Sequence, residues 1–298
     1  MRFAALLRGF AFPLLLPALL AGAGLLSTAV AARASDYQTV SFKSLQPDAP
    51  ELSGLLLKPD GAGPFKAVIM LHGCSGMLTK SGKLKKRPTF WSKWLVERGY
   101  LVLLADSFSA RGVNSICKTR DRPVTPDRDR PFDAYGALAY LQGRADVRPD
   151  RVALMGWSNG AMTLLWTVRR KAAARPADMA HDFRAAAAFY PGCVQIDKTN
   201  FTTDIPTIIQ MGEADDWTLP KPCERMVASA KAQGSPITID LHPGAYHNFD
   251  HPDAKVKTIV TKNSVYASGE KRVHTGANPE ARDMAVQNVG AFLDRWLD

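Results

Sequence analysis

The chain has 298 residues, of which 46% are hydrophobic and 22% are charged, with 22 glycines, 20 prolines and four cysteines. This composition excludes a disordered, collagen-like or disulfide-scaffold protein, and the length suits one large domain or two small ones. The formal net charge is +10. No zinc-ligand spacing or basic amphipathic helix accompanies this charge, so we expect no nucleic-acid partner.

The first 34 residues have the organisation of a secretory signal peptide. Two arginines give a basic start, an uncharged run follows at residues 9–32, and Ala29-Val30-Ala31 and Ala32-Arg33-Ala34 both fit a small-x-small cleavage site. The alternative is an uncleaved membrane anchor, because the run is long enough to span a bilayer. Prolines and glycines in the run favour cleavage. We therefore expect an exported protein without a stable membrane anchor, whose mature domain is residues 35–298.

After this segment the chain alternates predicted strands and helices. Continuous apolar runs indicate strands that are buried on both faces of a sheet, and apolar residues at helical spacing indicate amphipathic helices. The predicted strands are residues 37–43, 52–58, 67–71, 100–105, 151–155, 185–190, 207–211 and 237–241. The predicted helices are residues 89–98, 132–141, 160–170 and 284–297. Residues 111–130 and 252–280 are polar and are predicted to be irregular. The alternation indicates an α/β fold with a mostly parallel sheet and helices on both faces.

A sharp turn is predicted at Gly156-Trp157-Ser158-Asn159-Gly160, between the strand 151–155 and the helix 160–170. This is the setting that a nucleophile elbow requires, with small residues around an exposed serine. The N-terminus of the helix behind the serine supplies positive potential and free N–H groups. Ser158 is therefore the predicted nucleophile, and it requires a histidine base and a carboxylate that orients the base.

The acid and then the base follow the serine in this fold class. Asp215 is the predicted acid because it comes directly after the strand 207–211. Asp216 is its nearest competitor and Glu213 is a weaker third candidate, and a solvated turn without a catalytic role is the alternative. His247 is the predicted base, since its loop follows the strand 237–241 and can aim the imidazole at the serine. The other histidines beyond the elbow are assigned to strand or solvated positions, at 181, 242, 251 and 274.

The loop His72-Gly73-Cys74-Ser75-Gly76 ends the strand that we expect beside the elbow. In this fold such a loop donates one backbone N–H to the oxyanion hole, and the residue after the nucleophile donates the other. The predicted donors are the amides of Cys74 and Asn159. A glycine-rich turn without a catalytic role is the alternative.

Taken together, these segments resemble the dienelactone hydrolase family of the α/β-hydrolase superfamily. The matching residues are 72–76, 106–108 with 111–112, 156–160, 212–215, 243–250 and 278–281, and they cover almost all of the mature chain. The resemblance implies an α/β-hydrolase fold and the triad Ser158, Asp215 and His247. A lid domain is usually inserted after the strand 185–190, and only residues 191–204 lie there, so we expect no separate lid domain. The family uses an arginine to hold a substrate carboxylate, for which Arg111 is a candidate, with a structural salt bridge as the alternative. Trp157 and Trp217 are further candidates for lining the substrate site.

The expected export and the family resemblance together predict that the four cysteines form disulfides. An even number of cysteines in an exported protein indicates disulfides, and four cysteines allow three pairings. In the fold that the resemblance implies, the loops with Cys74 and Cys117 follow adjacent strands, and so do the segments with Cys193 and Cys223. The resemblance therefore implies the bridges Cys74–Cys117 and Cys193–Cys223.

These features predict a secreted or periplasmic serine hydrolase that cleaves a small carboxylic ester or lactone through an acyl-enzyme on Ser158. The mechanism needs no metal or cofactor, and its only required partner is the small-molecule substrate. One alternative is an acyltransferase or peptidase that uses the same triad. Another is a non-catalytic binding module on a hydrolase scaffold. The sequence leaves the oligomeric state open.

Overall fold

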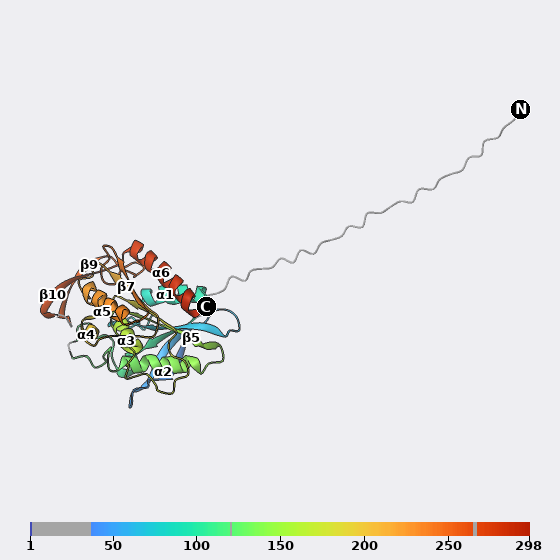
Figure 1. Cartoon of the computed structure of the whole chain (residues 1–298), viewed down its shortest axis with the longest axis horizontal. Helices are drawn as coiled ribbons and strands as arrows, with labels where there is room; N and C mark the ends of the chain where they lie inside the picture. The colour runs from blue at the N-terminus through green and yellow to red at the C-terminus, as the bar shows by residue number, and fades with distance from the viewer. Residues whose placement is uncertain (2–36, 120, 265–266) are drawn as a thin grey trace. The chain divides into compact units, whose positions relative to one another are not determined.

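The centre of the fold is one eight-stranded sheet in the computed structural model of the protein (Figure 1). Its strands are β1 (Gln38–Lys43), β2 (Glu51–Leu57), β3 (Phe65–Leu71), β4 (Leu101–Asp106), β5 (Val147–Trp157), β6 (Ala185–Phe189), β7 (Thr207–Gly212) and β8 (Ile237–His242). They lie in the order β1-β2-β4-β3-β5-β6-β7-β8. The pairs β1–β2 and β2–β4 are antiparallel, and the other neighbours are parallel. The predicted α/β fold with a mostly parallel sheet is confirmed.

The structure describes Met1 and residues 37–298, except residues 120, 265 and 266. The predicted signal peptide and its cleavage sites therefore lie outside the described residues, apart from Met1. None of the helices in the described part of the chain combines the length and the apolar character that a membrane span requires.

Helices cover both faces of the sheet. They are α1 (Lys86–Glu97), α2 (Arg130–Gln142), α3 (Asn159–Val168), α4 (Val194–Asp197), α5 (Pro220–Ala232) and α6 (Pro279–Leu297), with a short 3₁₀ turn η1 (Ser109–Arg111). The four predicted helices correspond to α1, α2, α3 and α6, whose ends differ from the prediction by up to five residues. Helices α4 and α5 were not predicted. Prolines in the first turn of α5 obscure its pattern, but a helix tolerates them there because the first N–H groups have no intrahelical partner.

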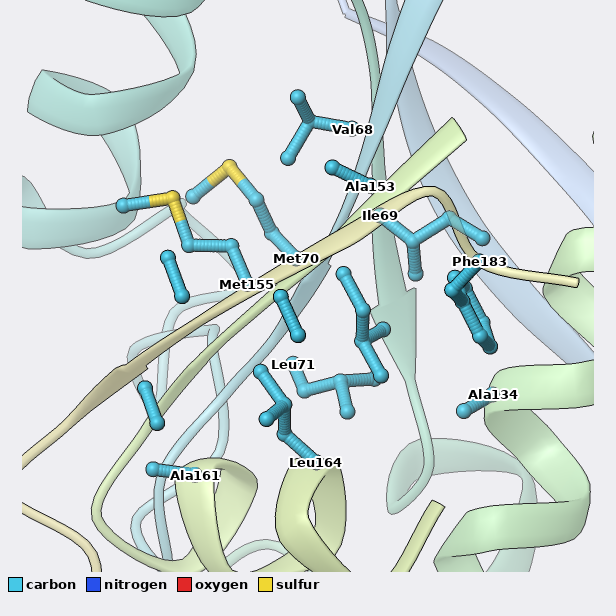
Figure 2. Close-up of a cluster of buried hydrophobic side chains, with 14 of the residues drawn as sticks. Val68, Ile69, Met70, Leu71, Ala134, Ala153, Met155, Ala161, Leu164 and Phe183 are labelled. Carbon is cyan, nitrogen blue, oxygen red and sulfur yellow. The ribbon is translucent and has the colours of Figure 1, made fainter. Parts of the chain in front are cut away.

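The main core lies where β3 and β5 meet α2 and α3. Five consecutive residues of β3, at positions 67–71, are all buried, because helices cover both faces of this central strand. Figure 2 shows the side chains of the last four among those of β5, α2 and α3. The labelled members of this cluster are Val68, Ile69, Met70, Leu71, Ala134, Ala153, Met155, Ala161, Leu164 and Phe183. The continuous apolar run in the sequence is thus explained by burial on two sides.

The prediction for residues 252–280 is wrong. This segment contains an antiparallel hairpin of β9 (Lys257–Ser264) and β10 (Ala267–Thr275). Its strands are mostly polar, so hydrophobic alternation could not indicate them. The base of the hairpin is held by backbone contacts to the loop after β8: Thr275 bridges His247, and the Gly276 N–H donates to the His247 carbonyl at 3.0 Å. Contacts with a segment distant in sequence, rather than a local hydrophobic pattern, therefore hold this hairpin in place.

Two disulfides join loops at the carboxyl ends of neighbouring strands, with the pairings that the resemblance implies. Cys74–Cys117 connects the segments after β3 and β4, and its Cα atoms are 4.9 Å apart. Cys193–Cys223 connects the segment after β6 to α5, with Cα atoms 5.0 Å apart. The first bridge thereby restrains the loop that contains Cys74.

Removal of the second bridge should destabilise the fold. Cys193 and Cys223 are 30 residues apart in sequence. A bridge that closes a loop of this length lowers the conformational entropy of the unfolded chain, which stabilises the fold by about 3–4 kcal/mol. We predict that the Cys193→Ala, Cys223→Ala double variant loses about this much free energy of unfolding, measured by urea denaturation. An unchanged urea midpoint would contradict the prediction.

Candidate active site

The site is built around Ser158, which lies in a strained turn between β5 and α3. Its φ is 50° and its ψ is −111°, a combination that few residues other than glycine adopt. The turn is tight because α3 starts directly against β3: a Cβ on Gly160 would lie 2.1 Å from the Leu71 carbonyl oxygen. A Cβ on Gly156 would lie 2.5 Å from the Gly160 oxygen. Both glycines of the motif are therefore required by the backbone geometry.

The structure brings the three predicted triad residues together. The His247 Nε2 atom is 3.1 Å from the Ser158 hydroxyl oxygen, and its Nδ1 atom is 2.8 Å from Asp215 Oδ2. Asp215 and His247 are buried, whereas Ser158 is partly accessible. The three side chains thus form a hydrogen-bonded row that ends at an accessible hydroxyl.

The two neighbouring aspartates occupy different environments. Asp215 Oδ1 accepts hydrogen bonds from the backbone N–H groups of Trp217 (2.9 Å) and Thr218 (2.8 Å), which fixes the carboxylate toward the histidine. Asp216 instead accepts a hydrogen bond from the His274 backbone N–H at 2.8 Å, and its Oδ2 lies 2.7 Å from His274 Nδ1. Only the first of the two carboxylates contacts His247, and His274 is paired rather than simply solvated.

Thr218 is a member of the site that sequence reasoning missed. Its hydroxyl oxygen lies 3.0 Å from His247 Nδ1 and 2.9 Å from Asp215 Oδ2. A threonine three residues after an aspartate has the spacing at which the aspartate accepts its backbone N–H, and this is the signal that could have found it. The hydroxyl adds a second polar contact at the Nδ1 side of the imidazole.

The loop that follows β3 lies directly against the elbow. An ideal Cβ on Gly73 would be 3.4 Å from the Trp157 carbonyl oxygen and 3.8 Å from the Ser158 Cβ. The Gly76 N–H closes a turn on the Gly73 oxygen at 3.2 Å, and Cys74 is the second residue of that turn. Cys74 and Asn159, which carry the predicted oxyanion donors, therefore belong to two segments that meet at Ser158.

His72 holds the start of this loop as a neutral imidazole. Burial, reinforced by the nearby Arg130 charge, lowers the pKa of His72 from 6.5 to about 3. Its Nδ1 lies 2.8 Å from the Gly73 oxygen, and its Nε2 accepts a hydrogen bond from the Ser107 N–H at 3.3 Å. A neutral ring with the proton on Nδ1 satisfies both contacts.

A buried carboxylate, Asp250, ties the histidine loop to the rest of the site. It is fully buried and accepts hydrogen bonds from the indole N–H groups of Trp157 (2.6 Å) and Trp91 (2.8 Å), and from the Tyr190 hydroxyl. Burial raises the pKa of Tyr190 well above its usual range, and Asp250 adds to the effect, so the tyrosine donates as a neutral phenol. The Tyr190 ring in turn packs against the His247 ring, with centroids 4.5 Å apart.

The predicted substrate-contacting residues divide into two groups. Trp217 packs against His247, with ring centroids 4.8 Å apart, and Trp157 lines a cavity beside the elbow. Arg111 is engaged elsewhere: it forms two hydrogen bonds of 2.8 and 2.9 Å with the buried carboxylate of Asp133 and one of 2.7 Å with the Ser107 oxygen. These contacts support the structural salt bridge that was the alternative for Arg111.

The cavity beside the elbow has a volume of about 180 Å³. It lies between the loop after β3, the start of α1 and the loop after His247. Apolar side chains from β3, β4 and the elbow form part of its wall, and Lys85, Arg87 and His251 contribute basic groups. An ideal Cβ on Gly73 would lie 3.7 Å from a terminal nitrogen of Arg87, so this guanidinium lies close to the elbow.

A known protein family matches most of this chain. The model of the family described as "Dienelactone hydrolase family" matches residues 52–297. A curated relative, "Putative hydrolase YtaP" of Bacillus subtilis (strain 168), is 30% identical over 118 residues, which is 35% of this chain and 39% of that protein. The match thus spans about two fifths of the relative's length.

Solved structures agree on the fold. A dienelactone hydrolase-like promiscuous phosphotriesterase, P91, from metagenomic libraries matches with a TM-score of 0.63 at 15% identity, covering 89% of this chain and 99% of that one. Thermogutta terrifontis esterase 2, phosphorylated by paraoxon, matches with a TM-score of 0.61 at 16% identity, covering 87% and 94% of the two chains. At these identities the likeness shows the α/β-hydrolase fold.

Because His72 is buried and neutral, we predict that the free energy of unfolding decreases in acid. Since its pKa is 6.5 in its ordinary state and about 3 in the fold, the unfolded chain binds more protons between these values. The contribution of His72 to stability is therefore complete above about pH 6.5 and is lost progressively as the pH falls toward 3. We predict that a His72→Gln variant shows a smaller decrease in Tm between pH 7 and pH 4.5 than the wild-type protein.

The matched control is His181→Gln, because His181 is exposed. This variant should keep the wild-type dependence of Tm on pH. The same slope in the His72 variant would show that the fold does not lower the pKa of His72, and it would contradict the prediction.

Proposed function

Because the chain belongs to the dienelactone hydrolase family, we propose that it is a serine hydrolase that cleaves a small carboxylic ester or lactone through an acyl-enzyme on Ser158. The observation that carries the proposal is the row Ser158–His247–Asp215, with contacts of 3.1 and 2.8 Å. These are the distances over which a serine proton is transferred to a histidine and the histidine is oriented by a carboxylate.

In the proposed mechanism Ser158 Oγ attacks the ester carbonyl while His247 Nε2 accepts the hydroxyl proton. Asp215 holds the proton on Nδ1 and stabilises the imidazolium that forms. The amides of Cys74 and Asn159 receive the negative charge of the carbonyl oxygen. His247 then protonates the leaving alcohol, and the acyl-enzyme forms. In the second half, His247 removes a proton from water, and the resulting attack releases the acid and regenerates Ser158.

The size of the neighbouring cavity supports a small substrate. About 180 Å³ is enclosed beside the elbow, and small-molecule sites for whole drug-sized ligands are larger, at about 300–1,000 Å³. The cavity is therefore assigned to one small acyl or alcohol group, while the remainder of the substrate lies toward the accessible side of Ser158.

We also propose that the protein acts after export, as residues 35–298. The signal-like N-terminal sequence and the two disulfides support this assignment, since disulfides persist in oxidising compartments. The family that the chain belongs to supports a small-molecule substrate.

The proposal is tested by hydrolysis of a short-chain aryl ester with the purified mature protein and its Ser158→Ala variant. We expect hydrolysis by the wild-type protein and a loss of at least ~10³-fold in kcat/KM in the variant, as for removal of a triad member. A fluorophosphonate should label the wild-type protein alone.

Other outcomes favour the other candidate functions. Faster loss of ester in the presence of an added alcohol, with formation of a new ester, would indicate an acyltransferase, and cleavage of peptide amides would indicate a peptidase. Absence of both hydrolysis and labelling would contradict an active triad and indicate a binding module.

The two adjacent aspartates give a second test. Asp215→Asn removes the carboxylate that contacts His247, so we expect kcat to fall by about 10⁴-fold through loss of the correct imidazole tautomer. Asp216→Asn is the matched control, because its carboxylate contacts His274, and it should retain kcat within about threefold. A larger loss in the Asp216 variant than in the Asp215 variant would reverse the assignment of the acid.

A further inference from the structure

Arg130 is a fully buried cation at the start of α2, and the mechanism above does not use it. One terminal nitrogen donates to Asn159 Oδ1 at 2.5 Å, and the other donates to the His72 carbonyl oxygen at 2.8 Å. The guanidinium also faces the Phe108 ring at 5.2 Å from its centroid. Its Nε atom has no hydrogen-bond partner among the described residues. Neither of the two acceptors is a charged group.

Such a burial is costly, and fold stability alone does not account for it. Desolvation lowers the pKa of Arg130 from 12.5 to about 10, so the group stays protonated at neutral pH. The nearby carboxylates of Asp133 and Asp106 favour the charged form of Arg130. Neither accepts a hydrogen bond from it in the described part of the chain: Asp133 is held by two hydrogen bonds from Arg111, and Asp106 accepts from the backbone N–H groups of residues 108 and 109. Replacement of a buried charge by a well-packed apolar side chain is often neutral or stabilising for a protein. The two hydrogen bonds from the guanidinium therefore indicate that Arg130 positions the segments that contain their acceptors.

The two acceptors belong to the segments that carry the proposed oxyanion donors. Asn159 supplies one donor through its own backbone amide, and His72 lies two residues before Cys74, which supplies the other. The segments are also in van der Waals contact, since a Cβ on Gly160 would lie 2.7 Å from the same His72 oxygen. A planar guanidinium with two donors in fixed geometry defines the distance between two acceptors better than a flexible ammonium does.

We propose that Arg130 is a positioning residue that sets the separation of the Cys74 and Asn159 segments, and through them the geometry of the oxyanion hole. This inference rests on the proposed serine hydrolase function. Its expected signature is a loss confined to the transition state. The oxyanion is fully developed only there, and a displacement of about 1 Å in a catalytic group costs on the order of 10²-fold in rate.

The first test compares three variants with the wild-type protein in ester hydrolysis. For Arg130→Met we expect kcat to fall by about 10²-fold while KM changes by less than about threefold. The kcat of Arg130→Lys should lie between those of the wild-type protein and Arg130→Met, because an ammonium retains the charge but does not form the two parallel hydrogen bonds of a guanidinium. Arg175→Met is the matched control. Arg175 donates to the Tyr135 hydroxyl (3.0 Å) and pairs with Asp182 (2.6 Å), and it has no contact with either donor segment. Its kcat should equal that of the wild-type protein.

A second measurement separates positioning from general destabilisation. A trifluoromethyl ketone adds to the serine hydroxyl and places a negative oxygen in the oxyanion hole, so its inhibition constant reports the same geometry. We expect this constant to rise in Arg130→Met in parallel with the loss of kcat/KM, and to stay unchanged in Arg175→Met. Equal changes in both variants would indicate a structural role and overturn the inference.

Asn159→Ala makes the test independent of how Arg130 variants fold. This substitution removes the side-chain acceptor but keeps the backbone amide. We expect a loss in kcat similar to that of Arg130→Met, and no further loss when the two substitutions are combined, because either substitution alone breaks the bridge between the two segments. A wild-type kcat in either single variant overturns the inference, as do additive losses.

The same experiments distinguish this inference from the function on which it rests. If the wild-type protein and Ser158→Ala are equally inactive, the proposed function fails. If the wild-type activity depends on Ser158 while Arg130→Met is unaffected, the function stands and the role of Arg130 fails.

Discussion

The close approach of the α3 N-terminus to the end of β3 is the constraint on which the site depends. The backbone at Gly160 leaves no room for a side chain beside Leu71. This approach forces the sharp turn at Ser158 and its positive φ. It also brings the loop after β3 against the elbow, so the two segments that carry Cys74 and Asn159 meet at Ser158. Strain of this kind persists only where the surroundings over-determine the backbone. Here the Ser158 N–H bond to the Phe189 oxygen contributes to that restraint.

The histidine is held by a second set of contacts from parts of the chain that are distant in sequence. Its backbone is paired with the end of β10, its Nδ1 atom faces Asp215 and Thr218, and its ring packs between Tyr190 and Trp217. Asp250 connects the same loop to the residue after β6, to the elbow and to α1 through three hydrogen bonds. The imidazole is therefore oriented before any substrate binds, which is the condition for efficient proton transfer.

The parts of this site that the sequence predicts are those with a local pattern. The apolar run of β3, the glycines on both sides of Ser158 and the acidic turn after β7 each have a physical requirement that acts within a few residues. The β9–β10 hairpin and the fork of Arg130 have no such pattern. Their positions depend on backbone contacts and on hydrogen bonds between residues far apart in the chain, so their roles became visible only in the fold.

Arg111 and Asp216 show a second limit of prediction from sequence, because each was a candidate for the site and each contacts another residue in the structure. Both are charged residues in suitable segments, and the sequence cannot decide which polar group each of them faces. In the structure Arg111 pairs with Asp133 and Asp216 pairs with His274. Composition and spacing supply candidates for a site, whereas the partner of each charge, which decides its role, is a property of the tertiary structure.

The proposed roles of Ser158 as nucleophile, and of the Cys74 and Asn159 amides as oxyanion donors, can be tested in one crystal structure. The mature protein is first allowed to react with an aryl phosphonate ester, whose tetrahedral phosphorus mimics the reacting carbon. We expect a covalent bond from Ser158 Oγ to phosphorus, with the phosphoryl oxygen within about 2.7–3.1 Å of both amide nitrogens. A phosphonate on another residue, or a phosphoryl oxygen directed away from the two amides, would contradict these roles.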